Sequence, residues 1–372
     1  HADRDLPDPF ATGPAAASWV SRLAGGGDLV RARTALDLVA SGLGHVRLVD
    51  DPHDAPASRA IDDVIRALAT ADGRVTSLDI ARLVAGLLRA AGTRARVAEI
   101  TAGMRPGEPA DPSAMLGRYV ALVGDTAVDT AGHTLLPARE LHAVAIDDGA
   151  VRGAMLAQSA LNAAYGGAQH DRVLGLADGA VAAWRDGVVP LAVRAEAWRI
   201  AGSTGGLSLA DQDLASAIAM RDEAPLHVLR ARFALLAGRG DLAGTEIRAA
   251  LARSRGFGPA ALAAAIAGIE AVDGGDRCRA LHESGDPWTP FAWTVCRGDA
   301  PAGAISITDA ARQLATTSTD PMQLAYAAAA GAEGVFARVR GTDRDELAAW
   351  LSALGRSDLA RDAGGSPRDA GR

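Results

Sequence analysis

The chain has 372 residues, of which 49% are hydrophobic and 4% aromatic, and its formal net charge is −7. This length accommodates two or three domains with buried cores and excludes a chain that is disordered throughout. All 38 basic residues are arginine, which excludes any chemistry that depends on lysine. The arginines are scattered among acidic residues, so we expect no nucleic-acid binding. No apolar run approaches the roughly 20 residues of a membrane-spanning helix, and we expect a soluble chain.

The first residue is His1 instead of methionine. We expect from this a processed chain, exported to the periplasm or cell surface after signal cleavage, with a cytoplasmic location as the alternative. Cys278 and Cys296 would form one disulfide in an exported chain and two buried thiols in a cytosolic one. Neither cysteine has metal-ligand spacing. We therefore expect no metal and no cofactor.

The first third of the sequence predicts helices followed by a few antiparallel strands. Residues 1–17 contain three prolines and no periodicity, which predicts a flexible arm. The predicted helices cover residues 15–23, 28–41 and 58–70, a proline-containing loop covers 49–57, and the predicted strands cover 95–100, 119–123 and 127–129. This order indicates an α+β domain over residues 18–145.

The segment Ser77–Val97 is the most informative part of the chain. Its apolar residues recur at helical spacing, and Gly92 ends the helix before a strand that is flanked by arginines. This segment resembles the transglutaminase-like fold, in which a nucleophilic cysteine starts the helix and an acidic residue follows two positions later. Asp79 fits that acidic position, but Ser77 stands in place of the cysteine.

The same resemblance implies a histidine at the head of the next strand and an aspartate in the strand after it. Arg118 occupies the expected histidine position, and Asp129 matches the aspartate. A thiolate nucleophile needs an imidazole to take its proton, and here two of the three roles are vacant. The resemblance therefore implies a degenerate domain without its reaction, in which Ser77, Arg118 and Asp129 are vestigial.

Two interpretations of Ser77 follow from its place at a helix start. Serine is a favoured N-cap residue, and this is the interpretation that we prefer. In the alternative, His133 or His142 replaces the missing base, which would give a hydrolase or acyltransferase acting on peptide or cell-wall amides. If Ser77 had replaced a natural cysteine by engineering, the missing histidine would still be unexplained.

From about residue 150 the sequence changes to alanine-rich helical pairs with an internal period. Pro190, Pro225, Pro259, Pro290 and Pro321 are separated by 35, 34, 31 and 31 residues. This period, with a proline closing each pair, resembles the tetratricopeptide repeat, in which two antiparallel helices form a unit. An irregular helical bundle is the alternative. Residues 150–360 are thus predicted to form an α-solenoid, and residues 361–372 a disordered tail.

The sequence as a whole predicts a transglutaminase-like α+β domain joined to an all-α repeat region, predominantly α overall. This order resembles bacterial transglutaminase-like proteins with tetratricopeptide repeats. The expected function is a non-catalytic scaffold that binds a protein partner through the solenoid groove. The residues that we expect to contact the partner are arginines on presumed first helices and two tryptophans near the cysteines, namely Arg194, Arg199, Arg230, Arg232, Trp288 and Trp293. The oligomeric state is left open.

Overall fold

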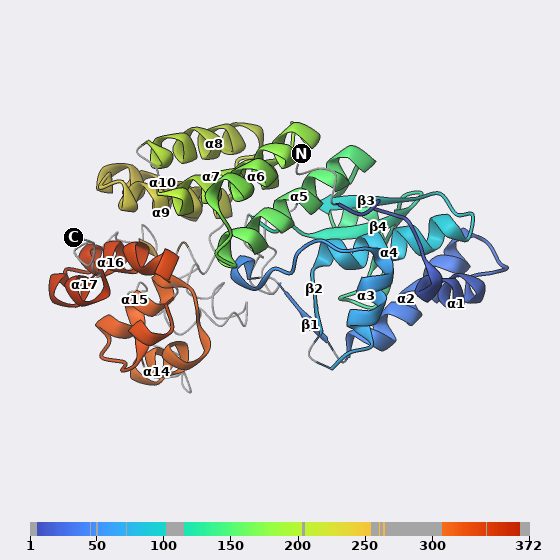
Figure 1. Cartoon of the computed structure of the whole chain (residues 1–372), viewed down its shortest axis with the longest axis horizontal. Coiled ribbons are helices and arrows are strands. Elements are labelled where there is room, and N and C mark those ends of the chain that lie inside the picture. The colour runs from blue at the N-terminus through green and yellow to red at the C-terminus, as the bar shows by residue number, and fades with distance from the viewer. Residues whose placement is uncertain are drawn as a thin grey trace. The chain divides into compact units, whose positions relative to one another are not determined.

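Figure 1 shows a computed structural model of the whole chain as a ribbon. The structure describes residues 6–44, 46–49, 51–71, 73–101, 115–202, 205–253, 260, 263–264, 307–339 and 341–364. Its described part is predominantly helical with a small sheet. The chain divides into two compact units, one reaching to Gly206 and the other running from Leu207 to Arg372. The first unit thus extends past the boundary that we predicted near residue 145.

The first unit combines seven α-helices and seven strands in its described part. The helices are α1 (Pro14–Arg22), α2 (Asp28–Leu43), α3 (Ile61–Leu68), α4 (Ser77–Ala90), α5 (Asp148–Tyr165), α6 (His170–Ala183) and α7 (Val188–Ala201), with 3-10 turns η2 (Pro52–Asp54) and η3 (Ala138–Glu140). The strands are β1 (Val46–Leu48), β2 (Gly73–Val75), β3 (Ala95–Ile100), β4 (Tyr119–Val123), β5 (Thr126–Asp129), β6 (Thr134–Pro137) and β7 (Ala143–Ile146).

Five of the strands form one antiparallel sheet in the order β6-β5-β4-β3-β7. The central strands β3 and β4 are rich in β-branched and apolar residues, and β4 is buried along its whole length. A two-residue turn joins β4 to β5, and Gly124 takes a positive φ of 58° there, as tight hairpins require. The three strands predicted from the sequence are the middle of this sheet.

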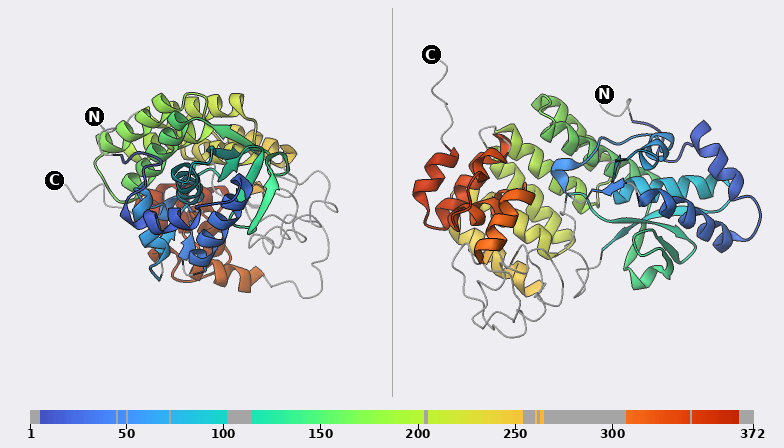
Figure 2. Two further views of the ribbon diagram at one scale, coloured as in Figure 1. Left: turned by 90° about the vertical axis from the view of Figure 1, so that its right-hand side faces the viewer. Right: turned by 90° about the horizontal axis from the view of Figure 1, so that it is seen from below.

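Helix α4 packs against β3 and β4 and forms the core of the first unit (Figures 1 and 2). Every residue from Leu78 to Leu88 is buried, because α2 and α3 also contact this helix. A helix that is enclosed on most sides can be apolar around its circumference. The high apolar content of this segment is therefore explained by its central position.

The segment before α1 packs against the unit, although the sequence predicted a flexible arm there. The Pro9 carbonyl accepts a hydrogen bond from Arg82 Nε at 3.2 Å, and the Arg89 guanidinium lies 3.6 Å from the centre of the Phe10 ring. Asp62 on α3 accepts the backbone N–H groups of Gly13 and Ala15 at 2.9 Å each. These contacts are long-range, so the local lack of periodicity gave no sign of them.

Helices α5, α6 and α7 follow the sheet as consecutive antiparallel hairpins. Each contacts the next along the chain, and α5 also contacts α7. α5 and α6 are closely packed at Gly153, since a Cβ there would be 2.6 Å from Trp184 Cβ and 3.0 Å from the Ala180 carbonyl oxygen. The alanine and glycine content of this region thus permits close approach of the helices.

The second unit is all-α in its described part. It contains α8 (Gly206–Met220), α9 (Ala224–Leu236), α10 (Gly240–Arg253), α14 (Ile307–Thr317), α15 (Pro321–Ala329), α16 (Arg344–Ala353) and α17 (Ser357–Gly364), with 3-10 turns η4 (Val335–Ala337) and η5 (Gly341–Asp343). Its core is built mostly from alanine side chains of α9, α10 and α14–α17. Trp350 on α16 is fully buried there and donates its indole N–H to Glu346 at 3.2 Å.

The recurring prolines that the structure describes lie in the first turns of helices, whereas their period in the sequence predicted them at helix ends. Pro190 lies in the first turn of α7, Pro225 in the first turn of α9, and Pro321 is the first residue of α15. The first N–H groups of a helix have no intrahelical acceptor, so proline loses nothing there and its fixed φ favours the helical conformation. Pro259 and Pro290 lie outside the described residues.

Part of the predicted tail is helical, because α17 extends to Gly364. Residues 365–372 lie outside the part that the structure describes. The same holds for Cys278, Cys296, Trp288 and Trp293. No described helix is long and apolar enough to cross a membrane.

Candidate functional site

The start of α4 is capped by Thr76, which corrects the prediction that Ser77 is the cap. Thr76 Oγ1 accepts the backbone N–H of Asp79 at 3.2 Å, and the Asp79 carboxylate accepts the backbone N–H of Thr76 at 3.1 Å. This is a capping box, in which two orphan donors are satisfied reciprocally. Ser77 is the first residue of α4, and its hydroxyl does not cap the helix.

The Ser77 hydroxyl instead contacts the backbone at the start of β4. It accepts the N–H of Tyr119 at 3.3 Å, and it lies 3.5 Å from the carbonyl oxygen of Gly117 as a long donor. Both groups flank residue 118. The structure therefore brings the start of α4 and the head of β4 together.

The side chain of Arg118, however, belongs to the other face of the sheet. The Arg118 carbonyl accepts the N–H of Ile100 at 2.8 Å and so continues the ladder between β3 and β4. Alternation along the strand then places Arg118 on the face of Val120 and Leu122. That face forms a small core cluster that contains no α4 residue, so α4 covers the opposite face. Tyr119 is the residue that shares the α4 face beside Ser77, and neither position holds an imidazole.

Asp129 is occupied by a local turn. Its Oδ1 accepts the backbone N–H groups of Ala131 and Gly132, both at 3.1 Å. This is the side-chain-to-backbone pattern of an Asx turn, which explains an aspartate at a strand end without any catalytic role. A Cβ on Gly132 would lie 2.5 Å from the Asp129 carboxylate, so the glycine is part of the same turn.

The two histidines considered as relocated bases have other environments. His133 Nε2 lies 3.0 Å from Asp37 Oδ1 on α2, and more than half of each side chain is exposed. His133 and His142 both adopt a positive φ, of 48° and 50°, which marks them as turn residues. His133 is hydrogen-bonded to Asp37, whereas the hydroxyl group of Ser77 forms its hydrogen bonds with backbone groups.

A buried pair of charges supports α4 from within. Arg82 and Asp79 are fully buried, with Arg82 Nη1 3.8 Å from Asp79 Oδ1. Burial lowers the pKa of Arg82 to about 10, and the Asp79 carboxylate opposes this effect. Arg59 also reaches Asp79 at 3.5 Å. The acidic residue that the resemblance singled out therefore caps the helix and balances a buried guanidinium.

The four arginines expected to contact a partner are all used inside their own units. Arg194 pairs with Asp178 at 3.2 Å, and Arg199 donates to Glu196 at 2.8 Å. In the second unit, Arg230 binds Asp211 at 2.7 Å and Glu246 at 2.9 Å, whereas Arg232 binds Glu346 at 2.5 Å and Asp320 at 3.3 Å. A partner would have to displace these carboxylates to bind the guanidinium groups.

A cluster around His227 was not recognised in the sequence. His227 Nδ1 lies 2.5 Å from Glu246 and Nε2 lies 2.7 Å from Asp222. Burial disfavours the imidazolium, but the hydrogen bonds and charges of the two carboxylates outweigh it and raise the pKa of His227. Glu246 also binds Arg230. These residues come from α9, α10 and the turn before α9, and the spacing of His227 and Glu246 by 19 residues gave no recognisable motif.

The described residues contain no group of histidine, cysteine, aspartate and glutamate side chains that could hold a metal ion. Comparison of the chain with protein-family models, with curated proteins and with solved structures finds no match. The functional argument therefore depends on the geometry of the site alone.

Proposed function

We propose that the chain is a non-catalytic binding protein, in which a transglutaminase-like first unit has lost its reaction and the helical pairs bind a protein partner. The observation that carries the first part is the environment of Ser77. Its hydroxyl is bound by the N–H of Tyr119, and the nearest strand offers Arg118 and Tyr119 where the reaction would need an imidazole. A serine hydroxyl without a general base is a weak nucleophile.

The contacts among α5, α6 and α7 support the proposal that the helical pairs bind a protein partner. Each helix contacts its successor, and the first helix of one hairpin contacts the first helix of the next. Stacked helical hairpins of this kind bury one face and leave a second face for ligands. In the second unit α9 and α10 form a further hairpin. The prolines in the first turns of α7 and α9 recur with the period of the repeat, but they lie at helix starts instead of helix ends.

The loss of catalysis is tested with the full chain and its Ser77→Ala variant. Both are incubated with chromogenic esters, glutamine-containing peptides with an amine acceptor, and peptidoglycan fragments. We expect neither protein to exceed the rate of the buffer. Turnover that Ser77→Ala abolishes would instead establish the cryptic hydrolase or acyltransferase. Turnover that persists in Ser77→Ala and survives a second purification route would contradict a non-catalytic chain.

Partner binding is tested by capture of proteins from the source organism on the immobilised full chain. A supporting result is one protein that then binds the purified chain in a defined stoichiometry, measured by light scattering after size exclusion. Absence of any such protein across growth conditions would contradict the proposal. A Ser77→Ala chain serves as the control and should retain the partner, because catalysis takes no part in the binding.

A further inference from the structure

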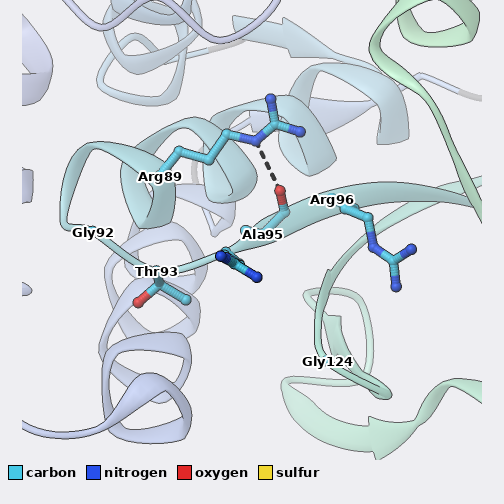
Figure 3. A pocket seen from close by; sticks show the side chains of 7 residues that line it. Arg89, Gly92, Thr93, Ala95, Arg96 and Gly124 are labelled. Atoms are coloured by element: carbon cyan, nitrogen blue, oxygen red, sulfur yellow. Dashed lines mark hydrogen bonds between the residues drawn. The ribbon is translucent and has the colours of Figure 1, made fainter.

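An open cavity lies at the far end of α4 from Ser77, where the helix turns into β3 (Figure 3). Its volume is about 640 Å³, and its lining comes from the α4 end, the following turn, the start of β3 and the β4–β5 turn. Three of the lining residues are arginines, namely Arg89, Arg94 and Arg96, and two others are glycines. In a chain with a net charge of −7, this is a local concentration of positive charge.

Arg89 is held rigidly at one side of the cavity. Its Nη1 and Nη2 bind the two Asp148 oxygens at 2.9 Å each, and its Nε donates to the Ala95 carbonyl at 2.8 Å. The guanidinium also covers the Phe10 ring. This bidentate pairing neutralises most of its charge, so Arg89 shapes the cavity more than it attracts a ligand.

Arg94 and Arg96 are exposed, and within the described part of the chain no carboxylate pairs with either. Arg96 is the second residue of β3 and Arg94 directly precedes the strand; burial alternates from Thr93 to Arg96, so both arginines are exposed while Ala95 between them is buried. Their flexible side chains can converge on one group or bind two groups of one ligand. Guanidinium groups match carboxylate and phosphate oxygens through paired N–H donors.

The carbonyl groups at this end of α4 are partly satisfied within the turn. A helix C-terminus normally presents free carbonyls, which repel negative charge. Here the Leu88 carbonyl accepts the N–H of Thr93 at 2.9 Å, and the Arg89 carbonyl accepts the N–H of Gly92 at 3.0 Å. Gly92 makes this turn possible with a φ of 85°. Gly92 and Gly124 add no side chains, which leaves the cavity open between the two arginines and the hairpin.

We propose that this cavity binds a small organic anion that carries a phosphate group or paired carboxylates, with Arg94 and Arg96 as its charge-bearing contacts and Arg89 as a fixed wall. This inference does not depend on the proposed function, because it concerns a different part of the first unit. The ligand class follows from two exposed guanidinium groups, one just before β3 and one within it, that no carboxylate of the described residues pairs and that line an open cavity.

The test is isothermal titration of the full chain with pyrophosphate and, separately, with citrate, at low ionic strength. We expect at least one of them to bind with a dissociation constant below about 1 mM. The double variant Arg94→Gln/Arg96→Gln should weaken this binding about tenfold or more, since each lost charged hydrogen bond contributes strongly. Preference for pyrophosphate would identify a phosphate ligand, and preference for citrate a carboxylate ligand.

The matched control is Arg172→Gln, which removes an exposed arginine from α6 in the same unit and should leave the affinity unchanged. Circular dichroism checks that all variants keep the fold. The proposal is overturned if neither anion binds, or if the double variant binds as well as the parent. It is also overturned if Arg172→Gln weakens binding equally, because the attraction would then be a general surface effect.

Discussion

Thr76 and Asp79 cap α4 reciprocally, with the hydroxyl of one and the carboxylate of the other each accepting the partner's backbone N–H. Asp79 also faces the buried Arg82. One carboxylate thus satisfies a helix terminus and balances a charge that has no access to water. Because it has both roles, loss of Asp79 should strongly destabilise the first unit.

We expect Asp79→Ala to reduce the stability of the first unit by about 3–5 kcal/mol, because it leaves the Arg82 guanidinium buried without its partner. The change is measured by urea unfolding, with hydrogen exchange of the α4 amides reporting the first unit separately. The control is Asp171→Ala, which removes an exposed first-turn aspartate from α6 and should cost no more than about 1 kcal/mol. Equal effects of the two substitutions would contradict the buried-charge argument.

Asp62 should stabilise the fold in a pH-dependent way. Burial opposes ionisation of this carboxyl group, but hydrogen bonds from the N–H groups of Ala15, Gly13 and Ala16 lower its pKa overall. A pKa lowered by folding gives stability that is present above the unfolded value near 3.8 and is lost as the pH falls through the folded value.

We therefore expect Asp62→Ala to cost about 1–2 kcal/mol at pH 7 and progressively less below pH 3.8. Denaturant unfolding of parent and variant across that range measures the difference. Asp63→Ala, on the exposed side of the same helix, where the Asp63 carboxylate pairs with Arg66, should change stability by about 0.5 kcal/mol or less. A difference between parent and Asp62→Ala that stays constant with pH would rule out the carboxylate as the cause.

Two helical glycines should respond oppositely to alanine. A Cβ on Gly153 would meet the Trp184 Cβ at 2.6 Å and the Ala180 carbonyl at 3.0 Å, whereas a Cβ on Gly175 meets nothing within 4 Å. We expect Gly153→Ala to destabilise the first unit by about 1–3 kcal/mol through forced separation of α5 and α6. Gly175→Ala should stabilise it by about 0.5–1 kcal/mol, because alanine favours the helix. Thermal unfolding of both variants checks the signs.

The sequence predicted the elements that depend on local pattern and missed those that depend on distant partners. Strands β3 and β4 were predicted with their observed bounds, because apolar residues and flanking turns mark them locally. Strands β1 and β2 were missed, since three residues that pair in parallel across 27 positions leave no periodic signal. The sequence marked Ser77 and Arg118 only through the resemblance, and the face of the sheet on which Arg118 lies could be learned only from the register.

The dependence on distant partners also explains why the sequence could not show which arginines are already paired, or where the cavity lies. Sequence identifies Arg230 and Arg232 as charges on a helix, but their carboxylate partners lie up to 114 residues away. Whether a guanidinium is available to a ligand depends on such partners. Arg94 and Arg96 appeared in the sequence only as flanks of a strand, and their significance arises from the cavity beside them.

His227 provides the final prediction, because both of its ring nitrogens face carboxylates. Asp222 lies before α9 and is also bound by Arg253, while Glu246 on α10 is also bound by Arg230. Folding raises the pKa of His227, so the protonated imidazole is favoured by the folded state. The stability that it contributes is fully present below the unfolded pKa near 6.5 and is lost as the pH rises through the folded value.

We expect His227→Gln to cost about 2 kcal/mol near pH 6, where the imidazolium makes two charged hydrogen bonds. The cost should shrink as the pH rises above 6.5, because the neutral ring can donate to only one carboxylate. Hydrogen exchange of the α9 amides at several pH values reports this unit separately from the first. His170→Gln, on an exposed position of α6 in the first unit, should leave these amides unchanged. A cost that instead grows with pH would mean that the folded protein favours the neutral imidazole, which would contradict this prediction.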